Sequence, residues 1–188
     1  MKRLFAAIKI EADENFLKLY WNLRNSLKHE KIKWVEEENL HLTLKFFGEI
    51  YDEKIDPICE LIDNSVIDCD SFELQLENVG IFGSSYNPKV IWYGIKLSSE
   101  LKFLHQTITE NLKTIGYYPD RQNFVPHLTI ARIKWIDDID KLKYLLQKYR
   151  GETIQKTKIG AVIYYESKLT ANGPIYNPVK KFPLKKAR

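Results

Sequence analysis

Two short segments of this sequence share a residue pattern that can do acid–base chemistry. One reads His41-Leu42-Thr43-Leu44 and the other reads His127-Leu128-Thr129-Ile130. An imidazole with an ordinary pKa of about 6.5 exists in both protonation states near neutral pH, so one histidine can accept a proton while another donates one. A threonine hydroxyl beside each imidazole can donate a hydrogen bond to a phosphate oxygen, where negative charge grows during reaction. The pattern therefore favours phosphodiester hydrolysis.

The two segments occupy equivalent places in two halves of the chain. His41 lies 37 residues after Leu4 (41 − 4), and His127 lies 37 residues after Val90 (127 − 90), with both starting points in matching apolar strands. The order strand, helix, strand, helix, strand repeats over about 3–82 and 89–165. We therefore expect one domain over 1–188, with two similar lobes related by a pseudo-twofold axis and one histidine from each facing a shared cleft.

Hydrophobic periodicity locates the elements that would carry these residues. Apolar positions at helical spacing predict helices near 13–28, 52–65, 99–115 and 137–148, with Asp13 as the N-cap of the first. The expected strands are 3–10, 33–35, 40–46, 72–82, 89–97, 126–133 and 154–165, with a last extended piece at 178–183. The segments 83–88 and 166–175 are predicted to be loops beside the cleft.

Strand geometry then predicts which side chains share a face. Side chains alternate along a strand, so each histidine lies beside its threonine on one face, while the intervening leucine packs into the lobe. By the same alternation, Lys45 joins His41 on the cleft face. Its counterpart in the second copy is Ala131, so Lys45 either distinguishes the two sides of the cleft or is an ordinary surface lysine.

Composition excludes several other classes of protein. The 188 residues include 29 basic and 25 acidic side chains, and this net charge of +4 is far below that of a protein that coats nucleic acid. No apolar run approaches the roughly 20 residues of a membrane helix, and Met1–Ile10 runs into charged residues as a first strand would. We therefore expect a cytoplasmic protein with no membrane partner, and a monomer, since nothing in the sequence requires a larger assembly.

The remaining candidate ligands do not suggest a metal site. Cys59 and Cys69 lack CxxC spacing and read as reduced structural thiols. His29 and His105 read as solvated or packing residues. A metal held by His41 and His127 would need a third ligand that their strand faces do not supply. We expect no metal and no cofactor.

The two tetrapeptides resemble the signature tetrapeptides of the 2H phosphoesterases. Flanking runs extend the resemblance, over nearly the whole chain, to the RNA 2′,3′-cyclic phosphodiesterases, which are also called 2′-5′ RNA ligases. These runs are Arg3–Ile8, Trp34–Val35, Asn39–Glu49, Val79–Phe82, Pro88–Trp92, Pro126–Arg132, Gly173–Tyr176 and Phe182–Leu184.

The resemblance implies a bilobal α+β fold in which antiparallel-dominated sheets flank a central cleft and helices lie on the outside. It also implies hydrolysis of a terminal RNA 2′,3′-cyclic phosphate to a 2′-phosphate, and the reverse joining of ends through a 2′-5′ linkage. His41 would donate a proton to the departing 3′ oxygen, and His127 would accept one from water. The residues alone leave these two roles open. The expected partner is an RNA with a cyclic phosphate end, and a tRNA-derived end is one candidate.

Two further residues are candidates for binding the substrate. The resemblance implies that Arg132 helps to hold the phosphate, but strict alternation places it on the face opposite His127, so the strand would have to twist, bulge or end there. Phe46 is a candidate for stacking on a base, but its place in the alternation favours the core.

Two other functions stay open at this point. The same two-histidine chemistry can act on a 2′-5′ oligonucleotide or on a small cyclic nucleotide ester. Alternatively, mild basicity and residues such as Trp34, Trp92 and Trp135 are compatible with a non-catalytic RNA-binding module, although those aromatic residues mostly occupy expected core positions.

Overall fold

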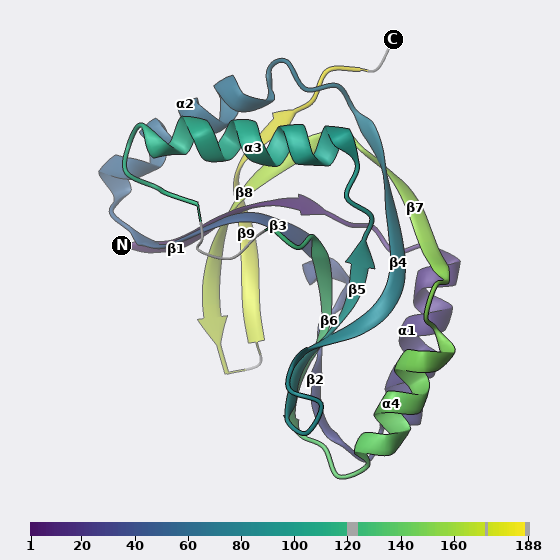
Figure 1. Cartoon of the computed structure of the whole chain (residues 1–188). Helices are drawn as coiled ribbons and strands as arrows, with labels where there is room; N and C mark the ends of the chain where they lie inside the picture. The colour runs from purple at the N-terminus through teal and green to yellow at the C-terminus, as the bar shows by residue number, and fades with distance from the viewer. Residues whose placement is uncertain (120–123, 172, 187–188) are drawn as a thin grey trace.

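The strands of the protein form two antiparallel sheets, in a computed structural model that describes residues 1–119, 124–171 and 173–186 (Figure 1). The β1 sheet has the order β3-β1-β8-β9, and the β5 sheet has the order β2-β6-β5-β4-β7. The strands of the first are β1 (Lys2–Lys9), β3 (His41–Ile50), β8 (Ala161–Thr170) and β9 (Gly173–Pro183). Those of the second are β2 (Lys31–Trp34), β4 (Phe72–Gly83), β5 (Pro88–Ile95), β6 (His127–Trp135) and β7 (Thr153–Ile159).

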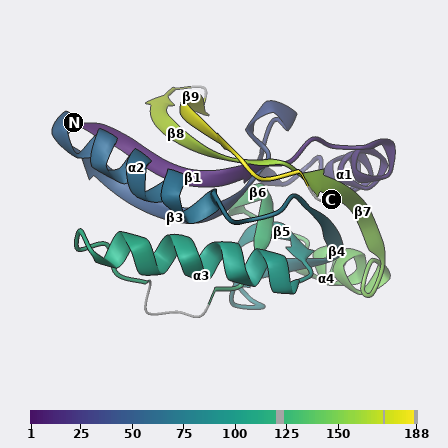
Figure 2. The ribbon, with the colours of Figure 1, turned by 90° about the horizontal axis from the view of Figure 1, so that it is seen from above.

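In the described part of the chain, four α-helices flank the two sheets, and each sheet has its own pair. Figures 1 and 2 show α2 and α3 side by side along the β1 sheet, and α1 and α4 at the other end of the molecule beside the β5 sheet. Their bounds are α1 (Glu14–Ser26), α2 (Ile55–Val66), α3 (Ser99–Lys113) and α4 (Ile139–Lys148). Asp13 caps α1 as predicted, because its carboxylate accepts from the backbone N–H of Phe16 at 2.8 Å. The α+β class, with antiparallel sheets and outer helices, is confirmed.

Each sheet takes strands from both halves of the chain. β4 follows α2 in sequence but pairs with β5, while β8, from the second half, pairs with β1. β2 also crosses over and pairs with β6. The two spatial lobes therefore do not coincide with the two sequence halves, and the origin of those halves by duplication stays a prediction.

The segment predicted as one strand over 154–165 is instead two strands that belong to different sheets. β7 pairs with β4 and ends at Ile159, Gly160 interrupts it, and β8 starts at Ala161 beside β1. Apolar residues continue through the break, so periodicity alone could not reveal it. The loop predicted at 166–175 is also wrong over most of its length, because β8 and β9 pair there as far as Thr170 and Gly173.

The two histidine-bearing strands meet where the sheets approach each other. β3 is an edge strand of the β1 sheet, and it contacts β6 of the β5 sheet. Leucines and isoleucines next to the histidines, such as Leu42, Leu128 and Ile130, are at most 1% exposed and anchor both strands in the core. No helix among the described residues is long and apolar enough to cross a membrane.

A tight contact between two neighbouring strands tests the packing beside His127. A Cβ added at Gly80 of β4 would lie 2.1 Å from Cζ2 of the Trp92 ring. We expect Gly80→Ala to displace this ring and lower the free energy of unfolding by about 1–3 kcal/mol, measured by urea denaturation. Gly160→Ala is the matched control, because a Cβ there meets no atom within 4 Å, and it should change stability little. Equal stability of the two variants would show that Trp92 is not held by this contact.

Candidate active site

A β-bulge in β3 changes which side chains face the cleft. Ala7 pairs with Thr43 and Ala6 pairs with Lys45, so Leu44 has no partner in β1. One extra residue in a strand reverses the alternation beyond it. The side chain two positions past the bulge therefore returns to the face of His41 and Thr43.

The bulge corrects the predicted places of Lys45 and Phe46. Lys45 is buried, only 8% exposed, and its Nζ donates to the backbone carbonyl of Tyr118 at 2.8 Å. Phe46 is 44% exposed, and the Arg3 guanidinium lies over its ring at 4.7 Å. The predictions that Lys45 faces the cleft and that Phe46 packs in the core are both wrong, because strict alternation does not continue through Leu44. Lys45 instead holds the segment that contains Tyr118.

β6 contains a bulge at the equivalent position. Trp92 pairs with Thr129 and Ile91 pairs with Ala131, which leaves Ile130 unpaired. Ala131 is fully buried, and Arg132 is exposed on the face that carries His127 and Thr129. The bulge that Arg132 needs in order to reach the cleft is therefore present. Phe46 and Arg132 are the same number of residues beyond their histidines, so they occupy equivalent positions on the two sides.

Both imidazoles are oriented by the same kind of hydrogen bond. Nδ1 of His41 lies 2.6 Å from the carbonyl oxygen of Asn39, and Nδ1 of His127 lies 2.8 Å from that of Val125. A carbonyl oxygen can only accept, so Nδ1 must carry the proton in each ring. Nε2 is then the nitrogen of each ring that can gain or lose a proton.

Aromatic rings surround His41 on the β1 sheet. Phe5 lies 5.0 Å from the imidazole, and Tyr176 of β9 packs edge-on against it at 5.1 Å. Phe5 and Tyr165 also stack on one another within a small apolar cluster separate from the main core. On the other side, Phe82 packs edge-on against His127 at 4.6 Å. These rings restrict the rotation of both imidazoles.

Charged residues of one sheet shift the pKa values of groups on the other sheet. Burial lowers the pKa of His41, the hydrogen bond to Asn39 opposes this shift, and the positive charges of Arg132 and His127 lower the pKa further. Burial also raises the pKa of Tyr176, while Arg132 and Arg3 act in the opposite direction. Arg132 thus acts on groups of the β1 sheet across the cleft.

Tyr176 and Arg3 were not predicted as site residues. Tyr176 lies beyond β8, in a segment whose pairing the sequence does not indicate, so its contact with His41 had no local signal. Arg3 did have one, since alternation in β1 places it on the same face as Phe5 and Lys9. The charged end of that strand could have been assigned to the cleft.

Comparison with known proteins identifies the family. A model of the LigT-like phosphoesterases matches residues 8–92 and 95–176. The chain belongs to the LigT-like phosphoesterase family. A Methanocaldococcus jannaschii relative named RNA 2′,3′-cyclic phosphodiesterase is 37% identical over 96% of this chain and 99% of its own length. A relative of the same name from Archaeoglobus fulgidus is 33% identical over 96% of this chain and 99% of its own length.

Solved structures share the fold. A Thermus thermophilus protein superposes with a TM-score of 0.79 at 22% identity, covering 99% of this chain and 100% of its own. Escherichia coli LigT in complex with 3′-AMP superposes with a TM-score of 0.75 at 22% identity, and the match covers 98% of this chain and 99% of that one. The fold of this LigT-like chain is thus a known architecture.

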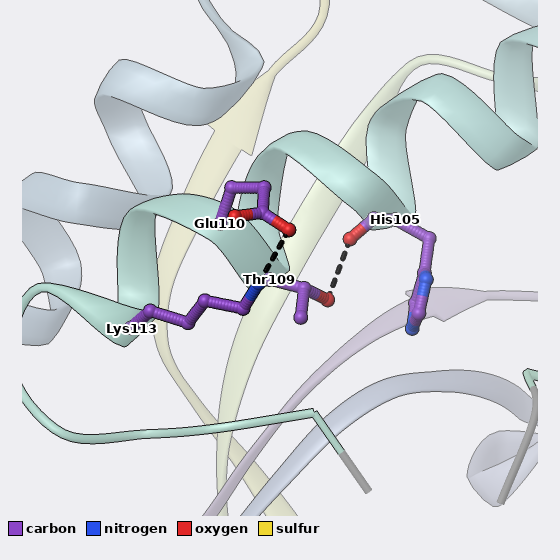
Figure 3. A network of polar contacts seen from close by, with 4 residues as sticks. All are labelled: His105, Thr109, Glu110 and Lys113. Carbon is purple, nitrogen blue, oxygen red and sulfur yellow. Dashed lines mark hydrogen bonds and ion pairs between the residues drawn. The ribbon is translucent and has the colours of Figure 1, made fainter.

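The other two histidines of this LigT-like protein have packing or surface positions. The His105 ring, on α3, stacks on Phe124 at 3.7 Å, and Thr109 donates to the His105 carbonyl at 2.7 Å (Figure 3). Figure 3 also shows the neighbouring pair of Lys113 and Glu110 on the same helix, at 2.6 Å. His29 is exposed beyond α1. Within the described ranges, no three His, Cys, Asp or Glu side chains form a group that could hold a metal ion.

The charge of Arg132 should be measurable at His41. An NMR titration should give His41 a pKa below the ordinary histidine value of about 6.5, and Arg132→Ala should raise it, because a positive charge that opposes protonation is removed. Lys134→Ala removes the same charge from the same strand and is the control, since Lys134 does not contribute to the shift of His41. An Arg132→Ala titration identical to that of the control would place Arg132 outside the cleft.

Proposed function

We propose that the protein hydrolyses terminal RNA 2′,3′-cyclic phosphates to 2′-phosphates with His41 and His127 as its acid–base pair and without a metal ion. The observation that carries the proposal is the matched orientation of the two imidazoles. Each Nδ1–H is held by a backbone carbonyl, so each ring keeps Nε2 for proton exchange, and the two rings come from strands in contact across the cleft. The activity for which the two archaeal relatives are named supports the same substrate.

The reaction needs one proton transfer at each imidazole. Nε2 of His127 accepts a proton from water as the water oxygen forms a bond to phosphorus. Nε2 of His41 donates a proton to the 3′ oxygen as the bond between phosphorus and that oxygen breaks. The product is a 2′-phosphate, and exchange with solvent returns both histidines to their starting states. A 5′-hydroxyl could take the place of water: its oxygen would form a bond to phosphorus as the bond to the 3′ oxygen breaks, and the same two histidines would move the protons as a 2′-5′ linkage forms.

Thr43, Thr129 and Arg132 stabilise the phosphate in this proposal. The two hydroxyls share the strand faces of the histidines and donate to non-bridging oxygens, while the guanidinium offsets the charge that grows on them. Arg132 supports the proposal through its effect on His41, and Phe46 through its exposed ring, on which a base can stack. Lys45 points to Tyr118, so substrate contacts are assigned to Arg132 and Phe46.

The substrate itself prepares His41 for the donor role. In the free protein, burial and the positive charge of Arg132 lower the pKa of His41, so this imidazole is largely neutral near pH 7. A bound phosphate anion would reverse part of this effect, because a negative charge close to an imidazole favours its protonated form. Proton donation would then be linked to occupation of the cleft.

Product analysis on a defined RNA tests the reaction. The protein, in the presence of EDTA, should convert an RNA that ends in a 2′,3′-cyclic phosphate to one that ends in a 2′-phosphate, identified by chromatography against both phosphate isomers. A 3′-phosphate product would reverse the direction of ring opening. Loss of hydrolysis in EDTA would refute metal independence, and binding without hydrolysis would favour the RNA-binding module. A faster rate on 2′-5′ oligonucleotides would reassign the substrate.

Single substitutions test the pairing. His41→Ala and His127→Ala should each lower turnover by roughly 10²- to 10⁴-fold, the usual contribution of a general acid or base. His105→Ala is the matched control, because that imidazole stacks on Phe124. Near-normal turnover in either of the first two variants would rule out the paired mechanism.

The pH dependence provides a separate check on the pair. The plot of kcat/KM should be bell-shaped, since one histidine must be neutral and the other protonated. His41 gives one limb of this bell, and because its pKa is lowered in the free protein, that limb should lie below the ordinary histidine value of about 6.5. A profile with both limbs well above that value would contradict a lowered pKa at His41.

A further inference from the structure

A groove of about 580 Å³ lies between β4, β5 and the exposed side of α4, and neither His41 nor His127 is among the residues that line it. We call it the α4 groove. Its volume falls within the range of small-ligand sites. The residues that define it here are Glu77, Trp92, Val125, Lys143, Gln147 and Arg150.

The α4 groove continues directly from the place that holds His127. In the register of β5 and β6, Gly94 pairs with His127 and Trp92 pairs with Thr129, and directly opposed residues of antiparallel strands share a face. Gly94 and Trp92 both line the groove. Val125, which also lines it, provides the carbonyl that accepts from Nδ1 of His127. A ligand that leaves the histidine pair along this face therefore enters the groove.

The side chains of α4 and of the turn after it give the groove a positive rim. Lys143 and Gln147 are four residues apart and lie on one side of α4, and Arg150 follows in the turn just beyond the end of the helix. All three are exposed. Nζ of Lys143 forms an ion pair with the Asp140 carboxylate at 3.0 Å. Arg150 has no acidic partner among the contacts of the described residues. Two cations and an amide thus face a space that opens toward solvent.

The opposite wall provides an acceptor and an aromatic surface. Glu77 is held by Gln75, whose Nε2 donates to its carboxylate at 3.0 Å. A carboxylate can accept from a ribose hydroxyl, although it would repel a phosphate placed beside it. Trp92 is half-buried and offers part of its indole ring. Phosphate donors on one wall and a hydroxyl acceptor on the other match a ribonucleotide better than a simple anion.

We infer that the α4 groove binds the ribonucleotide immediately 5′ of the cyclic phosphate end, an inference that rests on the proposed function. A terminal nucleotide with a 2′,3′-cyclic phosphate is joined to the rest of its RNA only through its 5′ oxygen, so any further nucleotide lies on that side. Arg150 and Lys143 contact the phosphate that links the last two nucleotides. The substrate class is thereby RNA ends of at least two nucleotides, rather than 2′,3′-cyclic mononucleotides.

Kinetics on two defined substrates test this inference. The probes are a dinucleotide that ends in a 2′,3′-cyclic phosphate and the corresponding 2′,3′-cyclic mononucleotide. The wild-type protein should have the higher kcat/KM on the dinucleotide. In the double variant Lys143→Gln/Arg150→Gln, the ratio of the two kcat/KM values should fall by roughly 5- to 30-fold, as expected for lost contacts between cations and a phosphate. The ratio of the two kcat/KM values should also depend less steeply on salt concentration in the double variant than in the wild type.

Lys141→Gln is the matched control, because it removes one positive charge from the same helix outside the groove. Its ratio of kcat/KM values should equal that of the wild type. Equal kcat/KM on the two substrates in the wild type would overturn the inference. A double variant that keeps the wild-type ratio would also overturn it.

A binding measurement separates this inference from the proposed reaction. A dinucleotide that ends in a 2′-phosphate should shift the NMR signal of the Trp92 indole N–H, assigned with Trp92→Phe, and should bind more weakly to the double variant. A nucleoside 2′-phosphate should leave that signal in place. If neither cyclic substrate is hydrolysed but these shifts occur, the groove binds the dinucleotide and the proposed reaction is refuted. If the dinucleotide leaves Trp92 unchanged, the groove does not bind it.

Discussion

The hydrogen bonds from Nδ1 of His41 to Asn39 and from Nδ1 of His127 to Val125 fix the chemistry of both imidazoles. Each bond sets the protonation of one nitrogen and the orientation of the ring, so proton exchange is confined to the other nitrogen. The carbonyl of Asn39 comes from a segment that is itself held. Asn39 ends the short 3₁₀ helix Glu37–Asn39, and its side chain also donates to the carbonyl of Pro174, two residues before Tyr176. One asparagine therefore links the orientation of His41 to the strand whose tyrosine packs against the same ring.

The bulges at Leu44 and Ile130 give the two sides of the cleft different chemistry within the same backbone geometry. In each strand the bulge turns one extra residue toward the core and returns the next to the cleft. One side then presents the ring of Phe46 under the guanidinium of Arg3, and the other presents the guanidinium of Arg132. A nucleotide is itself asymmetric, with a flat base at one end and charged phosphate at the other. Equivalent backbone positions with different side chains can thus orient such a ligand in one direction.

The sequence predicts the helices and most strands well, because those elements depend on local periodicity. It points to the histidine pair through a motif that occurs twice at the same spacing. The prediction fails where the pairing of strands that are distant in sequence determines the structure. Nothing local distinguishes Leu44 or Ile130 as a bulge, so Phe46 and Lys45 were assigned to the wrong faces, whereas the need for a bulge at Arg132 could be stated in advance. The break at Gly160 has the same cause: β7 and β8 are both apolar, and only their partners differ. Tyr176 meets His41 through β9, which is distant in sequence.

The exchange of strands between the halves has a consequence for how the chain can acquire its structure during synthesis. β1 lies between β3 and β8 in its sheet, and β8 is made long after β1, because the strands β2 to β7 come between them in the chain. β4 must likewise wait for β5, which is made after it. While the ribosome is still adding residues, the nascent β1 sheet therefore lacks the neighbour that covers one edge of β1, and that edge stays open until β8 has emerged. The strands made before β5 cannot complete either lobe, so the cleft forms only after β8 has been made.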